Sequence, residues 1–319
     1  MHKTDPVAAP NTLASLAGIL AILLWSTNIA FSKSIMEKEG TYNAAIYIFL
    51  FSGLCNAVVL SLYFGGREFF RKLRGLPVSY YTKTAVFFIF SNILLYLAIA
   101  RVSTNEELVI VSILNYSWPM LIYVLKIPVL GLPFKRALLA AGILFSGIGL
   151  VLAFMQGYSG HEIRGIFAAG DDNLTAYFLA LLNSVCWALY SNLTIRSRRE
   201  EDIAGIPVVF LIVGILFLVI QWIRHEGATV SFTRIYLNPE LVYQVLGPTG
   251  LGYLLWYIAM RRGNRNLITS LSFFIPVLSM FIIGLKFRIH IGPVFWVAIG
   301  LLILGSYACY RAFPGKNSV

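Results

Sequence analysis

Polar and aromatic residues that could bind a small molecule interrupt an apolar stretch in the first half of the chain. In the segment SILNYSWPMLIYVL, residues 112–125, the aliphatic run is broken by Asn115, Tyr116, Trp118 and Pro119. An amide donates and accepts hydrogen bonds, a phenol adds a hydroxyl, and an indole offers a broad apolar face with one N–H donor. Together these groups could hold an organic molecule that has both polar and apolar parts.

Similar combinations occur in other apolar segments, at spacings of three, four or seven residues. Residues with these spacings project from one side of a helix. The faces are Trp25 with Asn28 and Ser32, Asn92 with Tyr96, Trp118 with Asn115 and Ser112, and Trp187 with Asn183, Tyr190 and Thr194.

These faces are expected to lie at the same depth in the membrane. Trp25, Trp118 and Trp187 each lie roughly 17–20 Å along their segments, near the middle of a hydrocarbon core about 30 Å thick. An amide that faces lipid is costly, so the faces should meet around a shared cavity. The alternative is that these residues only pack and hydrogen-bond between helices. We predict a substrate-binding cavity lined by Trp118, Trp187, Asn115, Tyr116, Tyr96, Asn92, Trp25, Asn28 and Tyr190.

Two prolines should interrupt their helices near the same depth. Pro119 and Pro276 each lack a backbone N–H and clash with the preceding turn. A break at the midplane frees backbone groups that a substrate could use, so we predict a gating or kinking role for both. The alternative is a kink that neighbouring helices accommodate.

Composition places the chain in a membrane. Of its 319 residues, 58% are hydrophobic and 12% are charged, and the mean hydropathy is +0.78. The net charge of +11 comes from basic residues in short joints between apolar runs, which indicates topology control and not a nucleic-acid-binding face. We predict an all-α integral membrane protein without metal or cofactor. Its ten expected transmembrane helices are 12–32, 42–64, 80–100, 107–127, 136–156, 174–195, 204–223, 240–260, 267–286 and 293–312.

The second half of the chain repeats features of the first. LLYLAIAR, residues 94–101, aligns with LLWYIAMR, residues 254–261, and Pro119 aligns with Pro276 at nearly the same offset. Five helices per copy is an odd number, so the second copy enters the membrane from the opposite side. We therefore predict two inverted five-helix repeats, residues 1–157 and 158–319, that form one transporter domain.

The distribution of basic residues predicts the orientation in the membrane. With an even number of spans, both termini lie on the same side, and 17 of the 25 Lys and Arg residues share that side. Basic residues are retained in the cytoplasm, so we predict cytoplasmic termini.

The expected spans have no charged residue away from their ends. Proton-coupled carriers usually keep an embedded carboxylate or His as a relay, so the pattern favours a carrier without an obvious proton site. Two of the expected helices have a face of small residues, which is typical of close helix packing. These residues are Gly142, Ser146 and Gly149 on one helix, and Gly300 and Gly305 on another.

The motifs resemble those of a known group of carriers. LLWSTNIAFSK, LNYSWPML and SFFIPVLSM are similar to segments of the drug/metabolite transporter superfamily, in its EamA-like ten-helix exporters. NYSWP and CWALYSNLT resemble more narrowly the bacterial aromatic amino acid exporter branch. That resemblance implies an inner-membrane exporter that works by alternating access, with Trp118 and Trp187 lining its cavity and a third-helix position at Asn92, Leu95 or Tyr96.

The function that we expect is export of amino acids, aromatic or neutral, or of related small metabolites. Its partners would be the solute and the lipid bilayer, with no nucleic acid, in a monomer or weak homodimer. One alternative is an exporter of cationic drugs or quaternary ammonium compounds, which aromatic faces can hold by cation–π attraction. Another is an intramembrane lipid-modifying enzyme, for which an acid–base pair or metal cluster would be needed.

Overall fold

The computed structural model of the chain describes residues 11–156, 172–197, 200–223, 238–288, 290 and 292–313. Every regular element within these residues is helical. The elements are α1 (Thr12–Glu39), α2 (Thr41–Phe64), α3 (Gly66–Arg74), α4 (Val78–Tyr80), η1 (Tyr81–Ala85), α5 (Val86–Ala100), α6 (Asn105–Asn115), α7 (Trp118–Leu130), α8 (Arg136–Gln156), α10 (Asp172–Ser197), η2 (Glu200–Gly205), α11 (Ile206–Ile223), α12 (Pro239–Leu246), η4 (Gly247–Leu251), α13 (Gly252–Arg262), α14 (Arg265–Leu271), η5 (Ser272–Phe274), α15 (Ile275–Phe287) and α16 (Pro293–Ala312).

Eight helical runs in the described residues are long and apolar enough to cross a membrane. They are Thr12–Glu39, Thr41–Phe64, Val78–Ala100, Glu107–Leu130, Leu174–Ser197, Asp202–Ile223, Leu267–Phe287 and Pro293–Ala312. The two other expected spans, 136–156 and 240–260, coincide with α8 and with the run from α12 to α13. The all-helical membrane fold is therefore confirmed, whereas the count of ten spans and the inverted repeat remain predictions.

Local sequence signals set several helix ends. The Asn11 side chain caps α1 by accepting from the Ala14 N–H over 3.2 Å. Thr104 and Glu107 form a reciprocal capping box at the start of α6. Gly40, with a φ of 82°, turns the chain sharply from α1 into α2, in a conformation that only glycine adopts readily.

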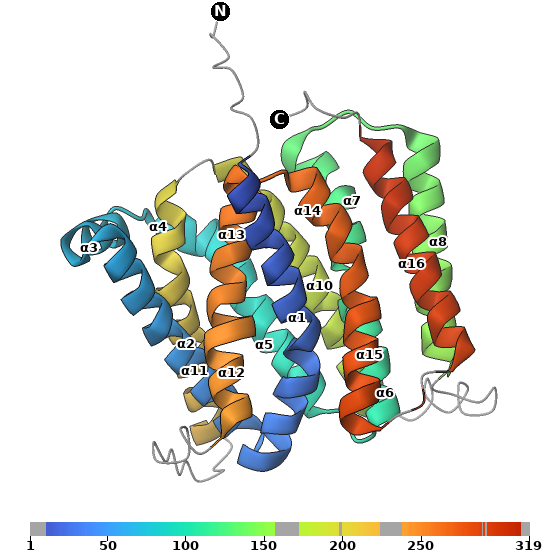
Figure 1. The fold of residues 1–319 in the computed structure, drawn as a ribbon, viewed down its shortest axis with the longest axis horizontal. Coiled ribbons are helices and arrows are strands. Elements are labelled where there is room, and N and C mark those ends of the chain that lie inside the picture. The colour runs from blue at the N-terminus through green and yellow to red at the C-terminus, as the bar shows by residue number, and fades with distance from the viewer. Residues whose placement is uncertain are drawn as a thin grey trace, which may run out of the picture.

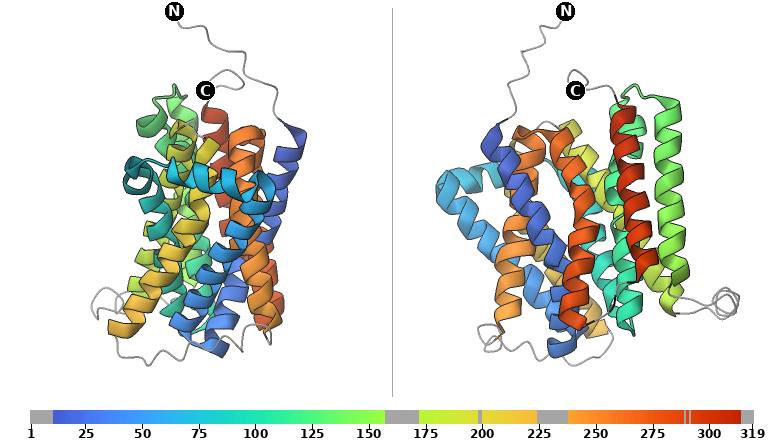
Figure 2. Two further views of the ribbon diagram at one scale, coloured as in Figure 1. Left: turned by 90° about the vertical axis from the view of Figure 1, so that its left-hand side faces the viewer. Right: turned by 45° about the vertical axis from the view of Figure 1, so that its right-hand side comes forward.

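The helices stand roughly side by side in one bundle (Figure 1). We call the end where α1 begins and α16 finishes the termini end, and the opposite end the far end. The antiparallel pair α8 and α16 forms one edge of the bundle, while α2 and α11 lie toward the other edge, next to the short basic helix α3 (Figures 1 and 2). Helices α1, α10, α13 and α15 lie between these edges and surround the middle of the molecule.

Small residues bring α8 and α16 together. A Cβ added to Gly149 would lie 2.7 Å from the Ala298 carbonyl oxygen, and one added to Gly142 would lie 2.7 Å from the Gly305 carbonyl oxygen. The predicted close packing is confirmed at these positions. It is wrong for Gly300, because a Cβ there would meet nothing within 4 Å. Gly300 therefore lies on a face of α16 that is turned away from α8.

Candidate functional site

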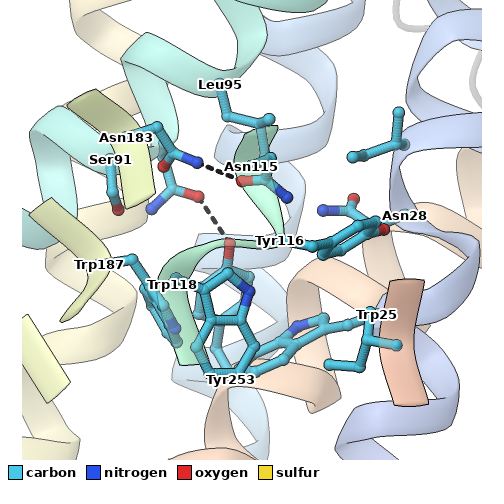
Figure 3. Close-up of a pocket in the computed structure, with 13 residues that line it drawn as sticks. Trp25, Asn28, Ser91, Leu95, Asn115, Tyr116, Trp118, Asn183, Trp187 and Tyr253 are labelled. Atoms are coloured by element: carbon cyan, nitrogen blue, oxygen red, sulfur yellow. Dashed lines mark hydrogen bonds between the residues drawn. The ribbon is translucent and has the colours of Figure 1, made fainter. Parts of the chain in front are cut away.

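A small cavity lies at the centre of the bundle, between α1, α5, α6, α7, α10, α13 and α15 (Figure 3). Its water-accessible volume is about 50 Å³, which is room for a few water molecules. None of the lining side chains is charged. The lining residues are Trp25, Asn28, Ile29, Ser91, Asn92, Leu95, Asn115, Tyr116, Trp118, Asn183, Trp187, Tyr253 and Ile275.

Aromatic rings close one side of this cavity. The ring centroid of Trp25 lies 6.3 Å from that of Trp118, 5.2 Å from that of Trp187 and 5.1 Å from that of Trp256. Tyr253 adds a fifth ring, 5.2 Å from Trp25. Most of these pairs are edge-to-face, the arrangement that the ring quadrupoles favour. We call Trp25, Trp118, Trp187, Tyr253 and Trp256 the ring cluster.

Amide side chains line the cavity opposite the rings. Asn183 Nδ2 donates to Asn115 Oδ1, and the Tyr253 hydroxyl donates to Asn92 Oδ1 over 2.9 Å (Figure 3). On α1, Asn28 Oδ1 accepts from Gln244 Nε2 of α12. These bonds hold the amides in fixed orientations, so the site offers neutral donors and acceptors beside an apolar wall.

The rings lie nearer the termini end than the amides do. Helix α1 starts at the termini end, and there Trp25 precedes Asn28. Helix α10 runs the other way, and on it Trp187 follows Asn183. Trp118 likewise follows Asn115 on the run from α6 to α7. The ring cluster therefore separates the cavity from the termini end.

The helix break at Asn115 is stabilised from a neighbouring helix. Helix α6 ends at Asn115, and α7 begins at Trp118 with Pro119 in its first turn. Pro119 has no N–H to offer the Asn115 carbonyl four residues earlier. The Ser184 hydroxyl of α10 instead donates to that oxygen over 2.6 Å. This bond lets the break exist at a buried position without an orphaned acceptor.

Hydrogen bonds and ion pairs tie the helices together at the far end. Glu240, at the start of α12, lies 2.7 Å from Lys286 Nζ of α15 and 3.0 Å from Lys38 Nζ of α1. It also accepts from the Ser34 hydroxyl over 2.7 Å. At the termini end, the Asn11 N–H donates to the Arg262 carbonyl over 2.9 Å. The cavity thus lies between two tied ends.

Seven of the nine predicted lining residues face the cavity. They are Trp25, Asn28, Asn92, Asn115, Tyr116, Trp118 and Trp187. Tyr96 instead accepts from the Ser32 hydroxyl over 3.1 Å and contacts the Phe49 ring. Tyr190 stacks on Phe88 with centroids 4.7 Å apart, one ring behind the cavity wall.

Both predicted prolines lie in the first turn of a helix. Pro119 is the second residue of α7, after the break at 116–117, and Pro276 is the second residue of α15, directly after the 3₁₀ turn η5. Their gating role remains a prediction.

Several residues at the site were not among the predicted ones. The sequence places Asn183 on the helical face of Trp187 without predicting it as a lining residue, and the prediction does not include Tyr253 or Trp256. The sequence does contain a signal for Trp256, because the alignment of LLWYIAMR with LLYLAIAR matches Trp256 to Tyr96.

Within the described residues no group of three or more His, Cys, Asp or Glu could hold a metal ion.

The second half of the chain is similar to a known family of membrane transporters. Residues 174–311 match the EamA-like transporter family. The EamA-like region therefore begins near the start of α10 and ends in α16, and it contributes Asn183, Trp187, Tyr253 and Ile275 to the cavity.

Relatives extend the similarity over nearly the whole chain. The chain is 25% identical over 299 residues to the aromatic amino acid exporter YddG of Escherichia coli, covering 94% of this chain and 97% of that protein. The protein of the same name from Salmonella typhimurium is 26% identical over 303 residues, again covering 94% and 97%. A solved crystal structure superposes with a TM-score of 0.66 at 22% identity, over 93% of this chain and 96% of the other, which shows a shared fold.

Proposed function

We propose that this protein carries amino acids with aromatic or neutral side chains, or related small metabolites, across the inner membrane through the central cavity. The observation that supports this proposal is the cavity itself, which has neutral amides on one side and three indoles on the other. The amides suit the ammonium and carboxylate of a zwitterion, and the indoles suit an apolar or aromatic side chain. The distant similarity to aromatic amino acid exporters supports the same substrate class.

Transport in this proposal needs a rearrangement of the rings. The present cavity of about 50 Å³ is much smaller than the roughly 300–1,000 Å³ of typical ligand pockets. A substrate therefore enters only when the ring cluster or the far-end ties separate. We propose alternating access, in which two inverted repeats, residues 1–157 and 158–319, rock about the cavity with both termini in the cytoplasm and net flux outward.

Counterflow into proteoliposomes tests this function. Vesicles loaded with unlabelled phenylalanine should take up labelled phenylalanine and tryptophan faster than vesicles without protein. Replacing both Trp118 and Trp187 by Ala should slow uptake by about tenfold or more, because two ring contacts are lost. Trp222→Ala is the matched control, since Trp222 is 77% exposed on α11 and should leave uptake unchanged. Flux equal to that of empty vesicles for all twenty amino acids would refute the proposal.

A cationic drug is the second candidate, because the same indoles could hold a quaternary ammonium group by cation–π attraction. The cavity lining offers such a cation no carboxylate. Labelled tetraphenylphosphonium in the same vesicles separates the two candidates. Uptake of this cation in place of amino acids would favour the second.

A further inference from the structure

A buried lysine lies between the cavity and the termini end. Lys126 is eight residues beyond Trp118 on α7, which places it about 12 Å further along the helix axis. Lys126 is buried, with a relative exposure of 7%. The Nζ atom lies 4.2 Å from the ring centroid of Tyr123 and 5.8 Å from that of Phe313.

No described acidic residue pairs with this ammonium. Among the described residues, no carboxylate lies within ion-pair distance of Lys126 Nζ, which contacts the two rings. Cation–π attraction offsets only part of the cost of desolvating an ammonium group. Within the described part of the chain, the closed termini end therefore buries a positive charge without a counter-ion.

The far end shows the contrasting case. Lys286 lies near the end of α15, the other helix that begins with a proline after a break, and it too lies over an aromatic ring, 4.6 Å from the centroid of Phe31. Lys286 has a counter-ion, because Glu240 lies 2.7 Å from its Nζ. The two ends of the path thus differ in one respect. The lysine at the far end pairs with a carboxylate, whereas no carboxylate of the described residues pairs with Lys126.

We propose that Lys126 binds the carboxylate of an anionic or zwitterionic solute at the termini end of the path, before the solute enters the uncharged cavity. This site rests on the proposed function for its place in transport, although carboxylate binding itself does not. When the termini end opens, the solute carboxylate supplies the counter-ion that the described residues do not provide to Lys126. The cavity amides then receive a substrate that the charge has already concentrated and oriented.

Binding of labelled benzoate, compared with its neutral isostere benzamide, tests the site in full-length protein reconstituted in nanodiscs. The unmodified protein should bind benzoate about tenfold or more tightly than benzamide, as expected for a charge-assisted contact. Lys126→Gln should abolish this preference and Lys126→Arg should keep it. Lys135→Gln is the matched control, because it removes the same charge from an exposed position at the same end.

Three results would overturn the site. They are equal binding of benzoate and benzamide by the unmodified protein, a preference that survives Lys126→Gln, and a preference that Lys135→Gln removes equally. A second titration distinguishes binding at Lys126 from binding in the cavity. In the variant with both Trp118 and Trp187 replaced by Ala, the preference for benzoate over benzamide should persist. If amino acid flux is absent while the preference depends on Lys126, the proposed function fails and the carboxylate site stands.

A measurement on the unmodified protein covers the case in which Lys126→Gln does not fold. Reductive methylation of Lys126, followed by mass spectrometry of its peptide, should slow in the presence of benzoate and not of benzamide. Methylation of Lys135 should be equal with both compounds. A Lys126 rate that benzoate leaves unchanged would count against the site.

Discussion

The indole N–H of Trp25 donates to the carbonyl oxygen of Pro248 over 3.1 Å. This bond joins α1 to η4, the π-helical turn that interrupts the run from α12 to α13. The approach is close, since a Cβ added to Gly252 would lie 2.8 Å from Trp25 Nε1. The central ring of the cluster is thus fixed to a backbone irregularity of the kind that often marks functional sites.

Trp25→Phe tests this bond. The substitution keeps an aromatic ring but removes the donor, so we expect a loss of about 1 kcal/mol in the free energy of unfolding. Denaturant unfolding in detergent, followed by circular dichroism, measures the loss. Trp222→Phe on the exposed face of α11 should change the stability by less than about 0.5 kcal/mol. Equal effects of the two substitutions would contradict a structural role for the Trp25 N–H.

Ser184→Ala should destabilise the helix break. It leaves the Asn115 carbonyl without the hydroxyl donor 2.6 Å away, which costs about 1–3 kcal/mol for a buried acceptor. Ser191→Ala on the same helix is the control, because the buried Ser191 hydroxyl has no hydrogen-bond partner among the described residues and its removal should be neutral or stabilising. Thermal unfolding in detergent compares the two. A smaller loss for Ser184→Ala than for Ser191→Ala would refute the account of the break.

Glu240→Gln should loosen the far end. The substitution leaves Lys38 and Lys286 without their shared carboxylate, and we expect a stability loss of about 1 kcal/mol. The loss should shrink in 1 M salt, where charges are screened within about 3 Å. Glu68→Gln, which affects the exposed contacts with Arg71 and Lys72 on α3, should cost less at either salt concentration. Salt-independent destabilisation by Glu240→Gln would indicate a packing defect.

Gly149→Ala should separate α8 from α16. The new methyl group would lie 2.7 Å from the Ala298 carbonyl oxygen, and overpacking of this kind costs about 1–3 kcal/mol. Gly300→Ala adds the same methyl group where nothing lies within 4 Å, so it should be neutral or slightly stabilising. Thermal unfolding of both variants in the same detergent gives the comparison, and equal melting temperatures would contradict the close packing.

The sequence alone predicts the features that arise where polar residues or a proline interrupt an apolar run. Asn115 and Trp118 inside an apolar run predicted a site, and Pro119 beside them predicted an interruption of the helix, because neither amides nor prolines suit a lipid-facing helix interior. Both residues line the cavity, directly beside that interruption. Periodicity alone also grouped Asn183 with Trp187 on one face of α10.

Other features depend on neighbours that periodicity does not specify. Tyr96 shares a helical face with Asn92, yet Phe49 of α2 and Ser32 of α1 surround its ring and hydroxyl. Tyr253 and Trp256 follow a π-helical turn, which shifts the 3.6-residue period and changes the face that they present. The ring of Phe313, which lies over Lys126 Nζ, comes from the end of α16, nearly two hundred positions away in the sequence.

The lack of charge in the cavity lining has an electrical consequence. A membrane potential does work only on charge that moves, about 2.3 kcal/mol per elementary charge for each 100 mV. A zwitterion has no net charge, and the side chains that line the cavity are uncharged, so transport of a zwitterion should move no net charge across the membrane. Potassium diffusion potentials of either sign should leave the amino acid uptake rate unchanged, and the solute's own concentration gradient would then set the direction of flux.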